Sequence, residues 1–568
     1  MLTILCARAG QDVRGELLER MGRSKAEKRL LLVPEQYSHD TERALCRTLS
    51  NAGARGCEVL SFTRLWARVA DAAGGGAAPA LDAGGRMLLL YRALRQVGDL
   101  LTSYKVTSRK PAFLSGLMAS IDECRSYSVA PGQLLAAGEE LGGPQGDKLR
   151  DIGLIYSAYE ALAAGGRADP RAKLDRLARA LEDSRWAAGK EIWVWGFTDF
   201  TAQEGAVLRA LLGQADVTAA LTCDLGDPSD IFDPVRRSIA YLTYLAEEQG
   251  VEVRQQAVLR PIPRADSLVH LEEQLFADRL EPWPGDCAVI RARADSPRQE
   301  VEWTAAEILR LVREEGYRFR DIGVCARDFA PYEGLTESVF AQYGVPVFLS
   351  TVTDVLQKPV LALVTSALAA AAGDYPYEEL FRYLKTGLAG ISEDERDELE
   401  NYVLTWDIKG GTWTRQKPWD MHPEGYGREF SDEDTALMER LDGLRRRVIA
   451  PLETLRRSPD RTGHGRALAL YRLMEDIDLP ARLEERAASL EDRGDLKTAA
   501  EYRQLWDILA GALEQCALLL GDVELELEEF SRLFSLALSQ YDVGTIPVSL
   551  DRAAAGDAPR MAGRTVKA

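Results

Sequence analysis

The chain has 568 residues, of which 46% are hydrophobic, and a formal net charge of −19 at pH 7. This composition is typical of a globular protein with about three or four domains. The acidic balance counts against a free-standing DNA-binding protein, which usually carries a basic excess. A local basic channel inside an acidic protein stays compatible with it, because binding depends on the local field.

The sequence supports neither a membrane protein nor a metal-binding protein. No apolar run approaches the ~18 residues of a membrane-spanning helix, and the N-terminus lacks the layout of a signal peptide, so we expect a cytoplasmic protein without membrane contact. The eight cysteines and four histidines are scattered. No two cysteines have CxxC spacing, so we predict no metal site and expect the cysteines to be reduced and buried as small apolar residues.

Strand and helix patterns alternate at the start of the chain. Residues 2–7, 29–36 and 57–62 are apolar runs that predict buried strands. Helical patterns separate them, as in a parallel α/β sheet. A Gly/Ala-rich break then covers 71–85.

A long helical stretch follows this break. Residues 86–186 have an almost wholly helical pattern, and strand patterns return at 191–197 and 215–224. The simplest interpretation is one α/β domain that is interrupted by a helical insertion.

A second α/β unit begins near residue 286. The runs 287–292 and 321–327 predict strands on either side of a helix, and 343–350 predicts a further strand. Residues 358–540 are again helical.

Two further segments have simple interpretations. The basic run 440–457 is typical of a solvated helix face. The last stretch, 541–568, has a loop-like composition, and its final five residues resemble the approach to a strand.

The turn after the first strand has the outline of a phosphate-binding loop without its chemistry. A working loop, GxxxxGK[ST], needs a Lys for the β- and γ-phosphates and a hydroxyl for Mg²⁺. Val13 stands at the Lys position and Arg14 at the hydroxyl position, while Asp12 adds negative charge. Taken alone, this stretch is more typical of an ordinary βα turn than of a phosphate site. The loop residues are Ala7, Arg8, Ala9, Gly10, Gln11, Asp12, Val13 and Arg14.

The acidic half of a nucleotide site is also missing. UvrD-like helicases carry V-D-E-F-x-D after the strand that resumes here at residue 191. Trp195 replaces the Mg²⁺-binding Asp and Gly196 replaces the catalytic Glu, while Asp199 remains. ATP hydrolysis needs both the phosphate clamp and the acidic pair. Their joint loss at matching positions favours a helicase-like domain without catalysis.

Several stretches together resemble one family, in collinear order over essentially the whole chain. The family is AddB, called RexB in some lineages, the B subunit of the bacterial AddAB ATP-dependent helicase–nuclease. The stretches are LLLVPEQYSHDTERAL, VLSFTRLWARV, IWVWGFTDFTAQE, YGVPVFL and YDVGTIPVSLDR.

The resemblance implies an α/β fold, a UvrD-like helicase core with two RecA-like (P-loop NTPase-type) parallel-sheet domains and large helical insertions. The first RecA-like domain would comprise 1–85 and 188–285, separated by an insertion at 86–187. The second would begin at 286–357, carry an insertion at 358–540 and resume at 541–568.

In the family a nuclease domain follows, with a 4Fe-4S cluster held by four cysteines and a Mg²⁺-dependent nuclease site. Both lie beyond the part that this chain resembles, so we expect a fragment that has no nuclease domain and no cofactor of its own. ATP binding is not expected either. Arg298 and Glu302 match a nucleotide-gripping segment of helicases, but we favour a packing role for their helix.

The resemblance also implies a function. The chain would be a catalytically silent subunit that works with AddA on double-strand DNA ends in recombinational repair. It would bind single-stranded DNA and scan it for the Chi sequence. Two alternatives are an active DNA translocase with a divergent nucleotide site, and a structural scaffold without DNA contact.

The loops after the second and third strands run along single-stranded DNA in UvrD-like helicases. Aromatic rings stack on bases, Gln pairs with adenine, and Arg pairs with guanine or phosphate. The DNA-contact candidates are therefore Gln36, Ser38, Phe62, Arg64 and Trp66, with Phe197 and Phe200 extending the platform.

The same residues also have structural interpretations. Phe62 and Trp66 lie four apart and suit packing on one helix face. Ser38 and Thr63 suit helix N-caps. Arg64 suits an ion pair with a carboxylate of the chain.

Overall fold

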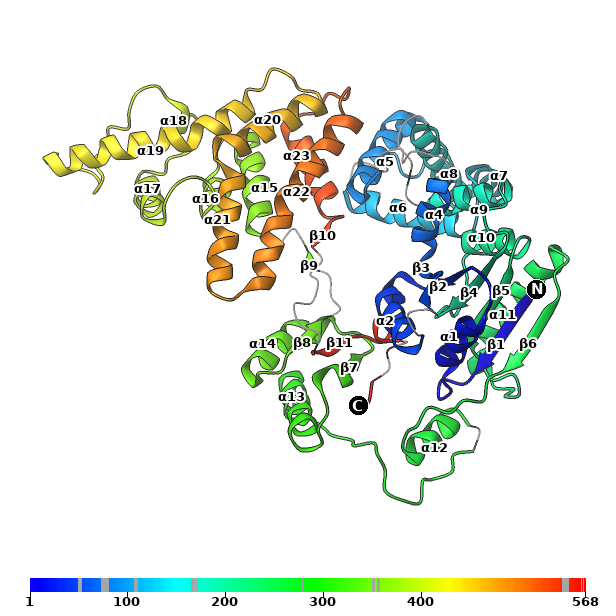
Figure 1. Ribbon diagram of the computed structural model, residues 1–568. Helices are drawn as coiled ribbons and strands as arrows, with labels where there is room; N and C mark the ends of the chain where they lie inside the picture. Colours follow the sequence, from blue (N-terminus) through cyan, green and yellow to red (C-terminus); the bar gives the residue numbers. More distant parts are fainter. Residues whose placement is uncertain are drawn as a thin grey trace.

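Two α/β units and a large helical assembly make up the computed structural model (Figure 1). Most of the predicted break at 71–85 and of the stretch 541–552 lies outside the described residues. The structure describes residues 1–49, 54–72, 81–106, 111–164, 169, 172–277, 279–349, 353–354, 358–543, 551–562, 564 and 566–568.

The first α/β unit is built on a six-stranded sheet in which every pair of neighbouring strands is parallel. The spatial order is β3-β2-β4-β5-β1-β6. All five strands predicted for this unit are present. The strands are β1 (Leu2–Ala7), β2 (Lys28–Leu32), β3 (Cys57–Leu60), β4 (Lys190–Trp195), β5 (Asp216–Thr222) and β6 (Val253–Ala257).

Both faces of this sheet are covered by helices, as an all-parallel sheet requires. One face packs against α4, α9, α10 and α11, and the other against α1 and α2. Helix α9 lies within the range predicted for the insertion, yet its buried residues join the core of the sheet. The helices are α1 (Val13–Arg23), α2 (Ser38–Thr48), α4 (Phe62–Ala72), α9 (Lys173–Glu182), α10 (Ala202–Leu212) and α11 (Asp233–Glu248).

Two helical regions far apart in the sequence share one hydrophobic core. Helix α5 joins them, because it contacts α6 and α8 of the first region and α22 and α23 of the second. The first region comprises α5 (Ala83–Val97), α6 (Pro111–Ser126), α7 (Pro131–Leu141) and α8 (Gly143–Ala164). The second comprises α15 (Pro359–Ala372), α16 (Tyr377–Leu384), α17 (Glu393–Trp406), α18 (Gly411–Thr414), α19 (Asp432–Arg456), α20 (Gly463–Asp476), α21 (Leu479–Asp492), α22 (Leu496–Leu519) and α23 (Leu527–Leu538).

The basic run at 440–457 lies on α19, and its arginines are held by neighbouring carboxylates. Arg440 pairs with Glu398 and Arg447 with Glu395. Arg445 is buried. The predicted solvated face is thus confirmed for Arg440 and Arg447 but not for Arg445.

The second α/β unit has a three-stranded parallel sheet in the order β7-β11-β8, with α13 and α14 packed against it. At its β7 side, the backbone N–H of Gly323 donates to the carbonyl of Ala568 at 2.9 Å, so the final residues do run beside a strand. The elements are α13 (Pro297–Glu314), β7 (Gly323–Ala326), α14 (Glu333–Tyr343), β8 (Val347–Leu349) and β11 (Ala553–Asp557).

The strand predicted at 287–292 is wrong. These residues have no strand assignment and are all exposed. An apolar run forms a strand only when a neighbouring strand accepts its backbone hydrogen bonds, and the described residues offer this run no such partner. Instead it belongs to an extended connection between α12 (Asp266–Gln274) and α13 (Figure 1).

Within the described part of the chain, no helix combines the length and apolar character needed to cross a membrane.

Candidate functional site

The predicted site residues gather at one edge of the six-stranded sheet. Because its strands are all parallel, the loops that follow β1, β2, β3 and β4 leave the sheet on the same side. These loops carry the degenerate phosphate loop, Gln36, the start of α4 and Phe197. This edge is where ligands bind in open parallel α/β sheets.

The backbone of the degenerate loop is engaged by carboxylates of the chain itself. The Gly10 N–H donates to Glu272 Oε1 at 3.1 Å, and Glu272 also pairs with Arg264. A Cβ at Gly10 would collide with the carboxylate of Glu272. Asp12 caps α1 by accepting from the Gly15 N–H at 2.8 Å. The positive end of this helix, which holds phosphate in nucleotide-binding loops, therefore faces protein carboxylates.

Arg8 is neutralised by two carboxylates that follow β5. Its Nε lies 2.7 Å from Asp224 Oδ2, and a terminal nitrogen pairs with Asp227. The hydrogen bond from Arg8 holds the pKa of the Asp224 carboxyl below its usual range. The guanidinium also lies 5.9 Å from the Phe232 ring centroid. Arg8 is thus bound within the domain rather than presented to a phosphate.

The positions that would hold Lys and Mg²⁺ in a working site have other partners. Val13 is buried in the core, as is Ala7. The Arg14 guanidinium lies 5.3 Å from the Trp195 ring centroid, a cation–π contact. Tyr37 also packs on Trp195, with ring centroids 5.8 Å apart. Trp195, at the position of the Mg²⁺-binding Asp, is therefore in contact with Arg14 and Tyr37.

Gly196 occupies the catalytic Glu position in a conformation that disfavours Glu. Its φ is +89°, and a Cβ there would lie 2.8 Å from the Tyr37 ring and 3.1 Å from Pro34. Asp199, the surviving acid, is exposed.

Three phenylalanines form a cluster beside this edge. Phe62 and Phe197 meet edge-to-face at 5.5 Å between centroids, and Phe197 stacks on Phe200 at 5.3 Å. Phe62 is only 5% exposed, and Trp66 packs against the same core. The packing interpretation therefore holds for both, and DNA contact by these four aromatic residues stays a prediction.

The polar DNA-contact candidates differ in exposure. Gln36 is exposed on a single 3₁₀ turn, η1 (Glu35–Tyr37), whereas Ser38 is 3% exposed. The side chain of Arg64 is half exposed and pairs with Glu35 at 3.3 Å and Glu42 at 3.5 Å. Gln36 and Arg64 are thus the candidates that reach solvent, and their DNA contact stays a prediction.

Neither of the two predicted N-caps, Ser38 and Thr63, caps its helix. The Ser38 side chain makes no capping hydrogen bond, because Tyr37 is the residue before α2. Ser61, not Thr63, caps α4, since its hydroxyl accepts from the Arg64 N–H at 3.3 Å.

Helix α13 shows the packing role that we expected. Its buried residues Val301, Ala305 and Ile308 face the core of the second unit. Arg298 pairs with Glu302 at 2.8 Å on the exposed side.

Sequence reasoning missed the residues that close the degenerate loop. Glu272 is 262 residues from Gly10, and Asp224 is 216 residues from Arg8. No local spacing signals pairs so distant. Glu35 and Glu42 were also missed, although their positions on either side of Gln36 offered a signal.

The cysteines do not suggest a metal or cluster site. Among the described residues, no group of three or more His, Cys, Asp or Glu could hold a metal ion. Burial raises the pKa of the Cys6 thiol to about 12, which keeps it protonated. The expectation of buried cysteines is wrong for Cys46, Cys287 and Cys325, which are exposed.

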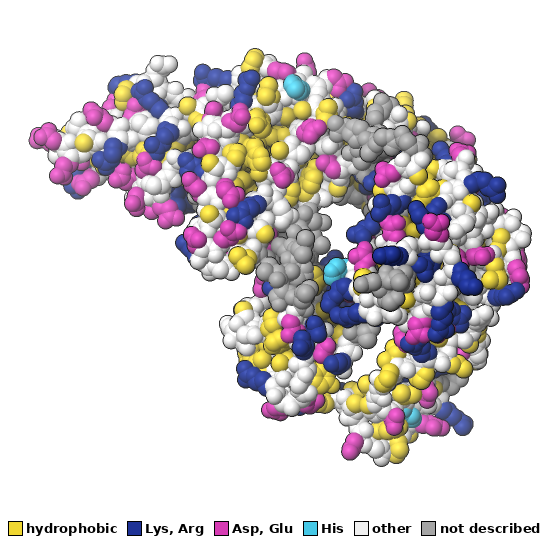
Figure 2. Space-filling view, in the orientation of Figure 1, with side chains coloured by type: hydrophobic (Ala, Val, Ile, Leu, Met, Phe, Trp, Pro, Cys, Tyr) yellow, Lys and Arg dark blue, Asp and Glu magenta, His cyan; other side chains and the backbone are white. Residues whose placement is uncertain are grey.

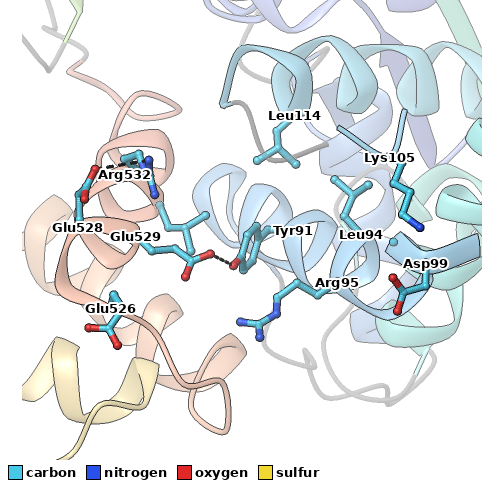
Figure 3. Close-up of a pocket in the computed structure, with 12 residues that line it drawn as sticks. Tyr91, Leu94, Arg95, Asp99, Lys105, Leu114, Glu526, Glu528, Glu529 and Arg532 are labelled. Carbon is cyan, nitrogen blue, oxygen red and sulfur yellow. Dashed lines mark hydrogen bonds and ion pairs between the residues drawn. The ribbon is translucent and has the colours of Figure 1, made fainter. Parts of the chain in front are cut away.

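A cavity of about 730 Å³ lies away from the strand ends, between α5 and α23. In Figure 3 the Tyr91 hydroxyl points from α5 to Glu529 on α23, and the two side chains are joined by a hydrogen bond of 2.5 Å. Charged groups of both signs line the cavity, among them Arg95 and Arg532. The cavity marks the junction of the two helical regions.

Lys and Arg side chains line part of the central opening. Figure 2 shows them along the side of the opening formed by the six-stranded unit and the first helical region. In a protein with a net charge of −19, Lys and Arg thus gather on this side of the opening, with Asp and Glu side chains among them.

Comparison with known proteins gives consistent matches. The family model described as "ADDB, N-terminal" matches residues 6–272. Proteins named as the B subunits of an ATP-dependent helicase/deoxyribonuclease are similar over 95% of this chain, with 36% identity in Symbiobacterium thermophilum, 36% in Desulforudis audaxviator and 32% in Acetivibrio thermocellus. The chain spans about half the length of these relatives, 49%, 49% and 48% respectively.

Proposed function

Because this chain is an AddB homologue, related to the N-terminal half of that protein, we propose that it is the helicase-like, catalytically silent half of an AddAB-type helicase–nuclease. Such a complex processes double-strand DNA ends for recombinational repair in the cytoplasm. In it, this chain binds single-stranded DNA and scans for Chi, while the partner AddA supplies ATP-driven movement.

The proposed lack of ATP hydrolysis rests on the residues that stand where Mg²⁺ and the nucleotide phosphates would be bound. Arg14 packs over Trp195, and the Glu272 carboxylate accepts from the Gly10 N–H. Phosphoryl transfer depends on positioned cations and backbone donors around the phosphates. In this chain the Gly10 N–H already donates to Glu272, and the Trp195 indole stands at the position of the Mg²⁺-binding Asp.

Phosphate release tests the silence directly. The purified chain, mixed with single-stranded DNA, Mg²⁺ and ATP, is expected to release phosphate at the rate of a protein-free blank. DNA-stimulated release above this rate would favour the alternative of an active translocase.

Single-strand binding is supported by three observations. Gln36 and Arg64 reach solvent at the edge where the loops leave the sheet, and positive charge gathers nearby. Phe197 and Phe200 lie partly buried beside them. Stacking surfaces and a basic rim are what sequence-tolerant single-strand binding requires.

Paired variants test this contact. Gln36→Ala and Arg64→Ala are each expected to weaken binding of a labelled oligonucleotide about 5- to 150-fold, as the loss of about 1–3 kcal/mol predicts. Arg68→Ala is the matched control, because Arg68 lies one turn further along α4 and pairs with Glu58. Binding that is unchanged in the first two variants would favour the scaffold alternative.

The partner is proposed from the relatives, which are named as B subunits. Co-elution with AddA on size exclusion is expected for the full-length protein, and separate elution would contradict the heterodimer.

A further inference from the structure

A small folded segment connects the two α/β units. It consists of residues 266–277 and 279–290, which we call the linker module, and Figure 1 shows its helix α12 outside the layers of both sheets. The backbone N–H of Ala288 donates to Ser267 Oγ at 3.0 Å, and that of Glu281 donates to Gln274 Oε1 at 2.9 Å. These hydrogen bonds fold the connection back onto α12.

The linker module exposes its large apolar side chains. Trp283 packs on His270 with ring centroids 5.3 Å apart, yet Trp283 is 37% exposed. None of the described residues of the module belongs to, or packs against, a hydrophobic core of the chain. The exposed large apolar side chains are Leu271, Leu275, Phe276, Leu280, Trp283, Val289 and Ile290.

The exposed apolar area is large enough for a protein interface. These side chains are between 37% and 72% exposed. At about 100 Å² for one fully exposed large apolar side chain, they present about 400 Å² of apolar surface. A standard interface buries about 800 Å² on each partner, of which rather more than half is apolar. Apolar patches of this size on a single chain mark binding surfaces.

The apolar surface is bordered by positive charge. Arg291 and Arg293 follow Ile290 and are exposed. Neither forms a hydrogen bond or an ion pair with another residue in the described part of the chain. In a chain with a net charge of −19, two arginines without a carboxylate partner are complementary to a partner that carries Asp or Glu at this place.

We propose that the linker module is the surface on which the partner subunit docks, with Phe276 and Leu280 at its apolar centre and Arg291 and Arg293 at its rim. This inference rests on the proposed heterodimer with AddA and assigns its contact surface on this chain. The matching surface of the partner is an apolar patch bordered by Asp or Glu side chains. Because the module connects the two α/β units, the partner is held beside both of them.

Binding to AddA tests the apolar centre. Immobilised AddA is titrated with the full chain, and the dissociation constant is measured by surface plasmon resonance. Phe276→Ser/Leu280→Ser is expected to weaken binding at least about 10-fold, because truncation of the apolar anchors of an interface is costly. Leu141→Ser/Leu404→Ser is the matched control, since these leucines are 60% and 57% exposed on α7 and α17. The control is expected to change binding less than about twofold.

A second variant tests the rim without removing apolar surface. Arg291→Glu/Arg293→Glu is expected to slow association with AddA at least about 5-fold at low salt, because the reversed charges repel the carboxylates of the partner. The difference should shrink at high salt, since exposed charges are screened. Circular dichroism verifies that all the variants are folded.

The outcomes distinguish the docking surface from the function on which it rests. If the unaltered chain does not bind AddA, the proposed heterodimer itself fails. If the chain binds and Phe276→Ser/Leu280→Ser binds equally well, the docking surface is overturned. A loss in the leucine control that matches the loss in this variant overturns it as well. Light scattering of the chain alone gives the third outcome: a dimer that Phe276→Ser/Leu280→Ser abolishes would assign the surface to a second copy and contradict the partner subunit.

Discussion

At the scale of single residues, packing contacts occupy the positions where a nucleotide-site motif would place its acids at the edge of the six-stranded sheet. Trp195 contacts both Arg14 and Tyr37, and so links the degenerate loop to the loop after β2. Gly196 then turns with a φ of +89° beneath Tyr37. The positions of the two missing acids are therefore occupied by packing contacts. Trp195 packs on Arg14 and Tyr37, and a Cβ at Gly196 would meet the Tyr37 ring.

Restoring the catalytic acid should fail for this reason. Gly196→Glu is expected to lower the free energy of unfolding by about 1–3 kcal/mol, because a left-handed φ strains a residue with a Cβ and that Cβ meets the Tyr37 ring at 2.8 Å. Urea unfolding followed by circular dichroism measures the loss.

Thr198→Glu provides the control, since Thr198 is exposed in the same loop and the same charge there should change stability by less than about 0.5 kcal/mol. Equal stability of the two variants would show that position 196 tolerates a side chain, against this account.

The sequence shows which residues replace those of a nucleotide site, but it does not show what these residues contact. Val13, Arg14 and Trp195 predict by their type alone that the nucleotide site is degenerate. The contact between Arg14 and Trp195 depends on two strands coming together. The residues that pack against a loop come from distant parts of the chain, so a local sequence pattern does not identify them.

At the scale of elements, the sequence predicts a strand correctly where consecutive residues are apolar and buried. The runs at β1, β2 and β4 are of this kind. Strand β6 was missed because its Arg254, Gln255 and Gln256 are polar and exposed at the sheet edge. Strand β11 was missed because alanines carry little strand signal, although it lies at the centre of its sheet.

The junction of α5 with α23 carries a testable interaction. Burial, together with the hydrogen bond to Glu529, raises the pKa of Tyr91 to about 12. Tyr91→Phe is expected to lower the free energy of unfolding by about 1–2 kcal/mol at neutral pH, because the hydrogen bond to a charged group is lost. Chemical denaturation measures this difference.

The difference should vary with pH in a defined direction. Because the folded pKa lies above the ordinary value of 10.0, the contribution of Tyr91 is fully present below pH 10 and is lost as pH rises toward about 12. The unaltered chain and Tyr91→Phe should therefore converge in stability over that window. A constant difference across it would contradict the role assigned to this hydroxyl.

At the scale of the whole molecule, α5 joins two helical regions that the sequence presents as separate insertions. Close approach makes the junction tight: a Cβ at Gly84 would lie 3.0 Å from the Ala537 carbonyl, and Asp82 accepts a hydrogen bond of 2.5 Å from Tyr541. A shared core between segments this distant has no periodic signature, so it could not be predicted. The division of the chain into domains stays a prediction.

One titration tests whether this chain holds a single strand without using ATP. The affinity of the chain for a labelled single-stranded oligonucleotide is measured at fixed salt, with and without Mg²⁺-ATP. We expect binding with the same affinity in both conditions, because the Glu272 carboxylate engages the degenerate loop and the Trp195 indole stands at the position of the Mg²⁺-binding Asp. No binding, or an affinity that changes when ATP is added, would contradict it.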